Sequence, residues 1–170
     1  MNHIFSILII LVLSVLSVSA QTENNSYKNF TDTAFIIGDK IPAPSIYFEF
    51  DGSSLVRKES YNAVKVIANF LIKHPNLMIE IGVHSDSRGS DDYNRRISQI
   101  KSENVKNVLV LEFGISKDRI ANRGYGESQP LEDCSLYIEC AHDESVEGIC
   151  IIDCPCHQRN RRVELKIIEL

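Results

Sequence analysis

The sequence has no surplus of basic residues and no internal repeat. Lys and Arg together number 18 against 23 Asp and Glu, for a formal net charge of -5. Because nucleic-acid binding depends on a basic face, this balance argues against a nucleic-acid partner. A mildly acidic chain is also not drawn from a distance to an anionic polymer, so any such polymer has to be recognised through local contacts.

The amino-terminal stretch lacks Lys and Arg, and its apolar run, from Ile4 to Leu16, is too short to span a bilayer comfortably. The run leads into small residues that end in Val-Ser-Ala at 18–20. This pattern is typical of a cleavable export signal, so we expect residues 1–20 to be removed after Ala20. A retained membrane anchor is the alternative, and the shortness of the run argues against it. The expected cleavage site has no Cys, so lipid attachment is not expected there.

Cleavage would leave about 150 residues, a length that suits one domain with a single core. Residues 21–44 are polar and end in Ile-Pro-Ala-Pro, as in a linker or a loosely packed lead-in. We expect the folded domain to cover residues 45–170, with a cysteine-bearing insertion at about 130–158.

The cysteines are confined to that insertion. In an exported chain we expect disulfides, because the compartment outside the cytoplasm is oxidising, and an odd count leaves at least one thiol over. A metal site from Cys150, Cys154, Cys156 and His157 is the alternative, but the Cys-x-Cys-His spacing is not a usual zinc pattern, and we expect no metal or other cofactor. The five cysteines are Cys134, Cys140, Cys150, Cys154 and Cys156.

The first half of the domain shows a strand, a helix and a second strand. Apolar residues alternate in Ile46–Phe50, which predicts a strand. Apolar residues then recur at helical spacing between Val64 and Leu71, and Pro75 ends that helix. The alternation in 79–83 predicts the second strand.

The second half adds a long helix and two strands. Asp91 opens the helix, where a carboxylate suits the positive helix end, and its expected buried stripe consists of Ile97, Ile100, Val105, Val108 and Leu109. Strands are predicted at 119–125 and at 163–167. The order β, α, β, α, β, insertion, β predicts an α/β (α+β) two-layer sandwich, with helices packed on one face of a mixed four-stranded sheet.

Polar residues concentrate in the segment 81–94, which joins the end of a strand to the start of the long helix. Free backbone N–H groups at a helix start can hold a carboxylate. Asn94, Ser98 and Lys101 follow at i, i+4 and i+7, so they share one helix face. On the pattern alone, a helix cap and a solvated face are the more usual interpretations.

Three stretches carry a resemblance to a known family: HSDSRGSDDYNRRIS, GISKDRIANRGYGESQP and NRRVELKI. Together they resemble the OmpA-like (OmpA/MotB) C-terminal domain, over about residues 45 to 168. The resemblance implies an α/β sandwich that recognises peptidoglycan non-covalently, through the diaminopimelate of the stem peptide, without catalysis. It also implies an exported protein in the periplasm, or on the periplasmic face of the outer membrane, of a Gram-negative bacterium. An outer-membrane protein is a further candidate partner.

The resemblance also assigns site residues. It implies that Asp86 is the ligand-binding aspartate and that Lys101 stands where the family has its partner arginine. Diaminopimelate presents an ammonium and a carboxylate on one carbon, so Asp86 would accept from the first and cations would donate to the second. Lys lacks the bidentate fork of Arg, which predicts weaker binding unless Arg162 compensates. The remaining site residues implied are Asp51, Ser85 in place of the usual threonine, Asn94, Ser98 and Arg161.

Two other functions compete with this assignment. An envelope scaffold or interaction protein with a weakened or lost peptidoglycan site is favoured by the lysine and by the enlarged insertion. An enzyme is suggested by the neighbouring His84, Ser85 and Asp86. Because adjacent strand residues point to opposite faces, Ser85 would point away from the other two, so we expect no catalysis.

Overall fold

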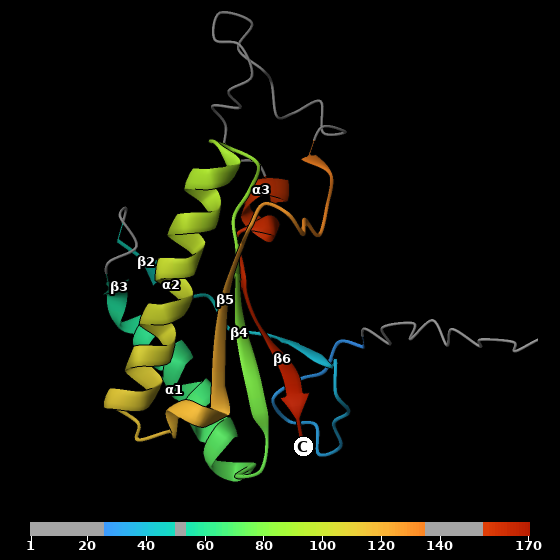
Figure 1. Ribbon diagram of the computed structural model, residues 1–170, viewed down its shortest axis with the longest axis vertical. Coiled ribbons are helices and arrows are strands. Elements are labelled where there is room, and N and C mark those ends of the chain that lie inside the picture. The colour runs from blue at the N-terminus through green and yellow to red at the C-terminus, as the bar shows by residue number, and fades with distance from the viewer. Residues whose placement is uncertain (1–25, 50–53, 135–154) are drawn as a thin grey trace, which may run out of the picture.

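The computed structural model describes residues 26–49, 54–134 and 155–170. Its centre is a four-stranded mixed sheet in which β4 pairs in parallel with β5 and antiparallel with β6, while β6 also pairs antiparallel with β1 (Figure 1). The expected export signal, at 1–20, lies outside the described residues. The strands of this sheet are β1 Lys40–Pro42, β4 Met78–His84, β5 Ile120–Gly126 and β6 Val163–Glu169.

One edge strand of the sheet comes from the segment that was expected to be a linker or lead-in. Ile41, in β1, is fully buried and lies opposite Leu165 of β6. Asp39 is also fully buried, and its side chain accepts a hydrogen bond from the Ile36 amide at 2.9 Å. The packed domain therefore begins well before residue 45. Pro42 fits an edge strand because it removes one N–H donor from the ladder.

The predicted strand at 46–50 does not join this sheet. Within it, Tyr47–Phe48 forms β2, which pairs only with β3 (Leu55–Val56) in a separate two-stranded sheet. Ser60 of the next helix ties this hairpin down, since its hydroxyl accepts from the Tyr47 amide at 2.8 Å. Local alternation identified a strand correctly but could not indicate which sheet it would join.

Two long helices cover one side of the sheet, as expected from the hydrophobic patterns (Figure 1). They are α1 (Arg57–Lys73) and α2 (Asp91–Leu111). The expected stripe of α2 needs one correction, because Ile100 is 37% exposed whereas Ser98 and Ser102 are fully buried. The core between the layers includes Val64, Ile67 and Leu71 of α1, Ile79 and Ile81 of β4, Val105 and Leu109 of α2, and Leu165 and Ile167 of β6.

The buried serines of α2 reflect an unusually close approach of this helix to β5. A Cβ atom at Gly124 would lie 2.1 Å from the backbone nitrogen of Gln99, and one at Gly126 would lie 3.0 Å from that of Arg95. The two glycines leave no β5 side chain in this contact, and Ser98 Oγ accepts a hydrogen bond from the Gly126 amide at 2.9 Å. The close contact places the start of α2 directly over the end of β5.

A short third helix, α3 (Pro155–Asn160), leads into β6. It stands near the ends of β4 and β5, at the top of Figure 1. None of the helices in the described ranges is both long enough and apolar enough to cross a membrane.

Candidate functional site

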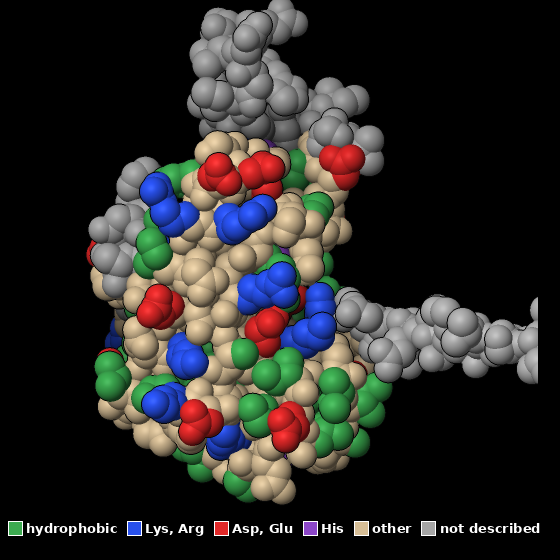
Figure 2. Space-filling model, in the orientation of Figure 1, with side chains coloured by type: hydrophobic (Ala, Val, Ile, Leu, Met, Phe, Trp, Pro, Cys, Tyr) green, Lys and Arg blue, Asp and Glu red, His purple; other side chains and the backbone are tan. Residues whose placement is uncertain are grey.

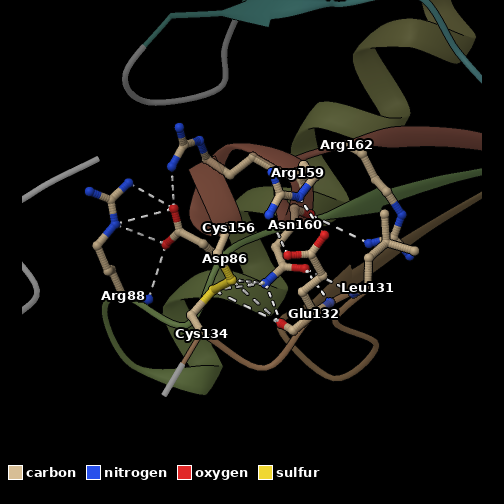
Figure 3. The surroundings of a disulfide bond; sticks show 10 residues. Asp86, Arg88, Leu131, Glu132, Cys134, Cys156, Arg159, Asn160 and Arg162 are labelled. Carbon is tan, nitrogen blue, oxygen red and sulfur yellow. Dashed lines mark hydrogen bonds and ion pairs between the residues drawn. A yellow bond between two sulfur atoms is a disulfide. The ribbon is translucent and has the colours of Figure 1, made fainter. Parts of the chain in front are cut away.

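The polar loop after β4 is organised around the side chain of Asp86. This residue is buried, with 5% of its surface exposed. The Arg88 guanidinium donates to the carboxylate, with Nη2 at 2.7 Å from Oδ2 and Nε at 3.2 Å from each oxygen, and the Arg88 backbone N–H donates to Oδ1 at 3.0 Å. Arg161 Nη1 also donates to Oδ2. Figure 3 shows Arg88 turned toward the Asp86 carboxylate.

These contacts keep Asp86 ionised. Burial by itself raises the pKa of the Asp86 carboxyl, but the hydrogen bonds from Arg88 and Arg161 outweigh it and hold that pKa below its ordinary value. The two guanidinium groups remain partly accessible, since 31% of the Arg88 side chain and 36% of the Arg161 side chain are exposed. The site is therefore a buried anion held by two cations that still reach solvent.

Lys101 of α2 completes the group of cations. Burial lowers the pKa of its ammonium, the nearby Arg161 charge lowers it further, and Asp86 opposes both effects. Its Nζ atom lies 5.4 Å from the centroid of the Phe48 ring, within the range of a cation–π contact. Two guanidinium groups thus contact the Asp86 carboxylate, and Lys101 is a third cation near them.

A cavity of about 570 Å³ adjoins this group. Ser85, Lys101 and Arg161 line it, whereas Asp86 itself does not. Its other walls come from the lead-in, from β2 and from α3, including Ala43, Pro44, Ser45, Ile46, Tyr47, Phe48, Gln158 and Arg159. Such a volume suits an amino acid or a short peptide stem.

The paired arginines expected before β6 separate in the structure. Arg161 reaches Asp86, whereas the guanidinium of Arg162 donates to the Gln129 carbonyl at 3.2 Å and to Glu164 Oε2 at 3.3 Å. The cation that sequence reasoning proposed as compensation for Lys101 was Arg162. It lines the same cavity as Arg161, but it is Arg161 that reaches Asp86. Consecutive residues near a strand start point to different sides, so the two arginines serve different clusters.

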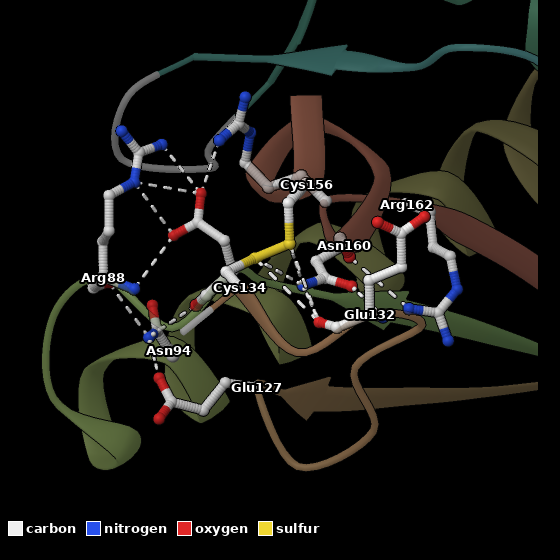
Figure 4. A network of polar contacts seen from close by, with 10 residues as sticks. Arg88, Asn94, Glu127, Glu132, Cys134, Cys156, Asn160 and Arg162 are labelled. Atoms are coloured by element: carbon white, nitrogen blue, oxygen red, sulfur yellow. Dashed lines mark hydrogen bonds and ion pairs between the residues drawn. A yellow bond between two sulfur atoms is a disulfide. The ribbon is translucent and has the colours of Figure 1, made fainter. Parts of the chain in front are cut away.

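Asn94 holds the loop rather than lining the cavity. Its buried Nδ2 donates to the Asp86 carbonyl at 3.2 Å, to the Arg88 carbonyl at 3.1 Å and to Glu127 Oε2 at 2.6 Å (Figure 4). Gly89 completes the turn with φ +105°, a conformation that favours glycine. Asn94 therefore fixes the backbone from which Asp86 and Arg88 project.

The other predicted site residues fall in three places. Ser98 is fully buried between α2 and β5 and does not line the cavity. Ser85 lines the cavity, and its backbone N–H is bonded to the Gly126 carbonyl at 2.8 Å. Asp51 lies outside the described residues.

Sequence reasoning missed Arg88 and Phe48 as members of the site. The signal for Arg88 was present, because a basic residue two positions after a buried aspartate can fold back onto it in a tight turn. No local signal could identify Phe48, since its contact with Lys101 joins β2 to the middle of α2.

The expected disulfides are found in part. Cys134 and Cys156 are joined (Figure 3), whereas Cys140, Cys150 and Cys154 lie outside the described residues. The disulfide excludes the alternative metal set that needed Cys156, because a sulfur in a disulfide is not a thiolate ligand. Among the described side chains, no group of three or more His, Cys, Asp or Glu is placed to hold a metal ion.

Charges of both signs are mixed over the rest of the molecule, as Figure 2 shows for one face. A second buried cluster centres on Glu164, which contacts Lys40 Nζ at 3.1 Å and His84 Nε2 at 3.2 Å. Burial raises the pKa of Glu164, but His84, Arg162 and Lys40 lower it to about 2. The His84 ring stacks on Tyr125 with centroids 4.8 Å apart.

Comparison with known proteins points to one family. A family model described as OmpA family matches residues 47–139. Outer membrane porin F of Pseudomonas fluorescens is 42% identical over 88 residues, which are 52% of this chain and 26% of the porin. Peptidoglycan-associated lipoprotein of Buchnera aphidicola subsp. Baizongia pistaciae is 35% identical over 113 residues, which are 65% of this chain and 61% of the lipoprotein. The chain spans less than two thirds of the length of either relative.

Solved structures agree on the fold. The crystal structure of the peptidoglycan-associated lipoprotein from Burkholderia pseudomallei superposes with a TM-score of 0.50 at 24% identity, covering 74% of this chain and 88% of that one. At this identity the likeness shows the fold alone.

Proposed function

This chain belongs to the OmpA family, and we propose on that premise that its domain binds bacterial peptidoglycan non-covalently, through the diaminopimelate of the stem peptide. The binding tethers or organises the cell envelope and involves no catalysis. The observation that carries the proposal is the buried Asp86 carboxylate, held by Arg88 and Arg161, beside a cavity of about 570 Å³ that Lys101 and Arg161 line.

The charges of the site suit a zwitterion. Lys101 and Arg161 line the cavity, so their charges can attract an incoming carboxylate. The ammonium on the same carbon then needs an acceptor, and Asp86 is the buried carboxylate of this site. A ligand with only one of the two charges satisfies half of this arrangement.

Binding proceeds by exchange of partners, because Asp86 is already paired with Arg88 and Arg161. A guanidinium gives up part of its contact with Asp86 and takes the ligand carboxylate, while Asp86 takes the ligand ammonium. No buried charge is left unpaired, which matters because an unpaired buried charge is strongly destabilising. The exchange also predicts modest affinity, since much of the gain only replaces bonds that the free protein already has.

The test is retention on purified sacculi. We expect Asp86→Ala to lose binding and Asp118→Ala, in the short helix before β5, to retain it as a matched loss of one carboxylate. Equal retention of wild type and Asp86→Ala would remove Asp86 from the site. Sacculi with lysine in place of diaminopimelate should bind more weakly, because lysine has no carboxylate on the carbon that carries its side-chain ammonium. Release of soluble muropeptides during the incubation would contradict a purely binding role.

An envelope scaffold with a weakened peptidoglycan site is the second candidate. It is favoured by the same two arginines, because they saturate Asp86 and compete with the ligand ammonium. Wild-type protein that does not bind sacculi, while it remains folded, would favour this function.

The place of action is proposed with the function. We propose that the protein is exported and acts in the periplasm or on the periplasmic face of the outer membrane, where peptidoglycan is accessible. An outer-membrane protein is the partner proposed to keep it there. Fractionation of cells that express the full chain tests this location, and recovery in the cytoplasm would contradict it.

A further inference from the structure

The segment after β5 is joined to α3 by a buried side-chain amide. Asn160, the last residue of α3, is 2% exposed. Its Oδ1 accepts from the backbone N–H groups of Leu131 at 2.8 Å and Glu132 at 3.2 Å, and its Nδ2 donates to the Glu132 carbonyl at 2.9 Å. One side chain thus satisfies three backbone groups of a segment that has no regular secondary structure to satisfy them.

A disulfide reinforces the same junction. Cys134 and Cys156 are bonded, and Asn160 Nδ2 lies 3.2 Å from the Cys134 sulfur. Arg159 also forms an ion pair with Glu132. Figure 3 shows the amide, the disulfide and the ion pair gathered at one place. We call Asn160, the disulfide and segment 131–134 the α3 clamp.

The α3 clamp adjoins the candidate site. Arg161 follows Asn160 directly, and its backbone N–H donates to the His157 carbonyl at 3.1 Å, so it extends the last turn of α3. The direction of its side chain is therefore set by the helix. Gln158, Arg159 and Arg161 all line the cavity, which makes α3 one of its walls.

We propose that Asn160 and the Cys134–Cys156 disulfide are positioning groups for peptidoglycan binding, because they hold α3 so that Arg161 meets Asp86 and the cavity keeps its wall. The inference rests on the proposed function for its ligand. A long, partly exposed side chain holds one rotamer only at a cost in conformational entropy, so its contact persists only when its backbone is fixed. Neither Asn160 nor the disulfide contacts the ligand, and both act through Arg161.

The test follows the Asp86 carboxyl by NMR titration of the disulfide-bonded chain and of its variants, together with retention on sacculi. We expect Asn160→Ala, and separately the double variant Cys134→Ala/Cys156→Ala, to raise the Asp86 pKa and to reduce retention roughly tenfold. Arg119→Gln is the matched control, because Arg119 also satisfies several backbone carbonyls, those of Leu71, His74 and Leu77, at the far end of β5. It should lower the melting temperature without changing the Asp86 pKa or retention.

A double-mutant cycle separates positioning from general loss of structure. Arg161→Gln should itself raise the Asp86 pKa, and Asn160→Ala should add little to that rise when Arg161 is already absent. A folded Asn160→Ala variant with an unchanged Asp86 pKa would overturn the proposal. If that variant does not fold, the disulfide variant decides by the same criterion. Failure of the wild type to bind sacculi would overturn the proposed function instead, and the Asp86 titration would still decide the role of the clamp.

Discussion

The Lys101 ammonium lies 5.4 Å from the centroid of the Phe48 ring, so that α2 and the β2 hairpin meet at the cavity. The face of an aromatic ring attracts a cation, but it is not a strong hydrogen-bond acceptor. The contact therefore holds Lys101 in place while its three N–H donors can still serve a carboxylate. Phe48 therefore supports the ammonium group of Lys101.

Replacement of Lys101 by arginine should tighten binding to sacculi. The guanidinium can donate two parallel hydrogen bonds to one carboxylate and stacks equally well on Phe48. Lys101→Met, which keeps the length but removes the charge, should weaken binding by about 1.5 to 3 kcal/mol. Retention at graded protein concentrations measures both. Weaker binding by Lys101→Arg would show that Lys101 is not a carboxylate partner.

Asn94→Ala should reduce both stability and binding. The variant loses three hydrogen bonds from Nδ2 and frees the loop that carries Asp86 and Arg88. We expect a loss of about 1 to 3 kcal/mol in the free energy of unfolding, measured by urea denaturation. Ser98→Ala is the control, since it also leaves a buried partner, the Gly126 amide, without its acceptor. It should lose comparable stability and keep its binding, and a loss of binding there would place Ser98 in the site after all.

Gly124→Ala should be among the most destabilising single changes in the sheet. The new Cβ atom would lie 2.1 Å from the Gln99 backbone nitrogen, and backbone cannot move aside as a side chain can. We expect a loss of about 3 kcal/mol or more, because α2 has to shift away from β5. Gly82→Ala is the comparison, since its Cβ would meet side-chain atoms, the Tyr125 ring at 3.0 Å, rather than backbone. Thermal denaturation of both variants should rank Gly124→Ala as the less stable, and the reverse order would contradict the close contact.

The Glu164 cluster should make stability depend on pH in the acid range. Its pKa is lowered from 4.5 to about 2, because contacts with His84, Arg162 and Lys40 outweigh the effect of burial. A carboxyl whose pKa is lowered by folding stabilises the protein above its unfolded pKa, and this contribution is lost as the pH falls through the folded value. The free energy of unfolding should therefore decrease between about pH 4.5 and pH 2.

Glu164→Gln isolates this contribution. The variant should lose on the order of 2 kcal/mol in the free energy of unfolding at pH 7. This value is smaller than the pKa shift alone would give, because solvent screens the partly exposed cations. It should also show a flatter stability curve in the acid range. Urea denaturation at several pH values measures both effects, and an unchanged slope would mean that other carboxylates dominate acid unfolding.

The order of elements and the identity of the loop could be read from local patterns. The alternation in β6 and the helical spacing in α1 depend only on neighbours along the chain, so the fold class followed from them. The segment from His84 to Asn94 likewise carries its motif in consecutive residues, and the family resemblance of that motif pointed to Asp86. A cysteine-rich stretch in a chain expected to be exported also predicted a disulfide, although not the pairing of Cys134 with Cys156.

Only the tertiary structure decided which cation meets Asp86. Arg161 and Arg162 are equivalent in the sequence, and the side each faces depends on how α3 enters β6. In the same way, Ile41 became part of an edge strand because β6 offered it a partner, while β2 was left to pair with β3. Local patterns report the preferences of neighbouring residues, whereas pairing between distant segments depends on which surfaces are brought together when the whole chain packs.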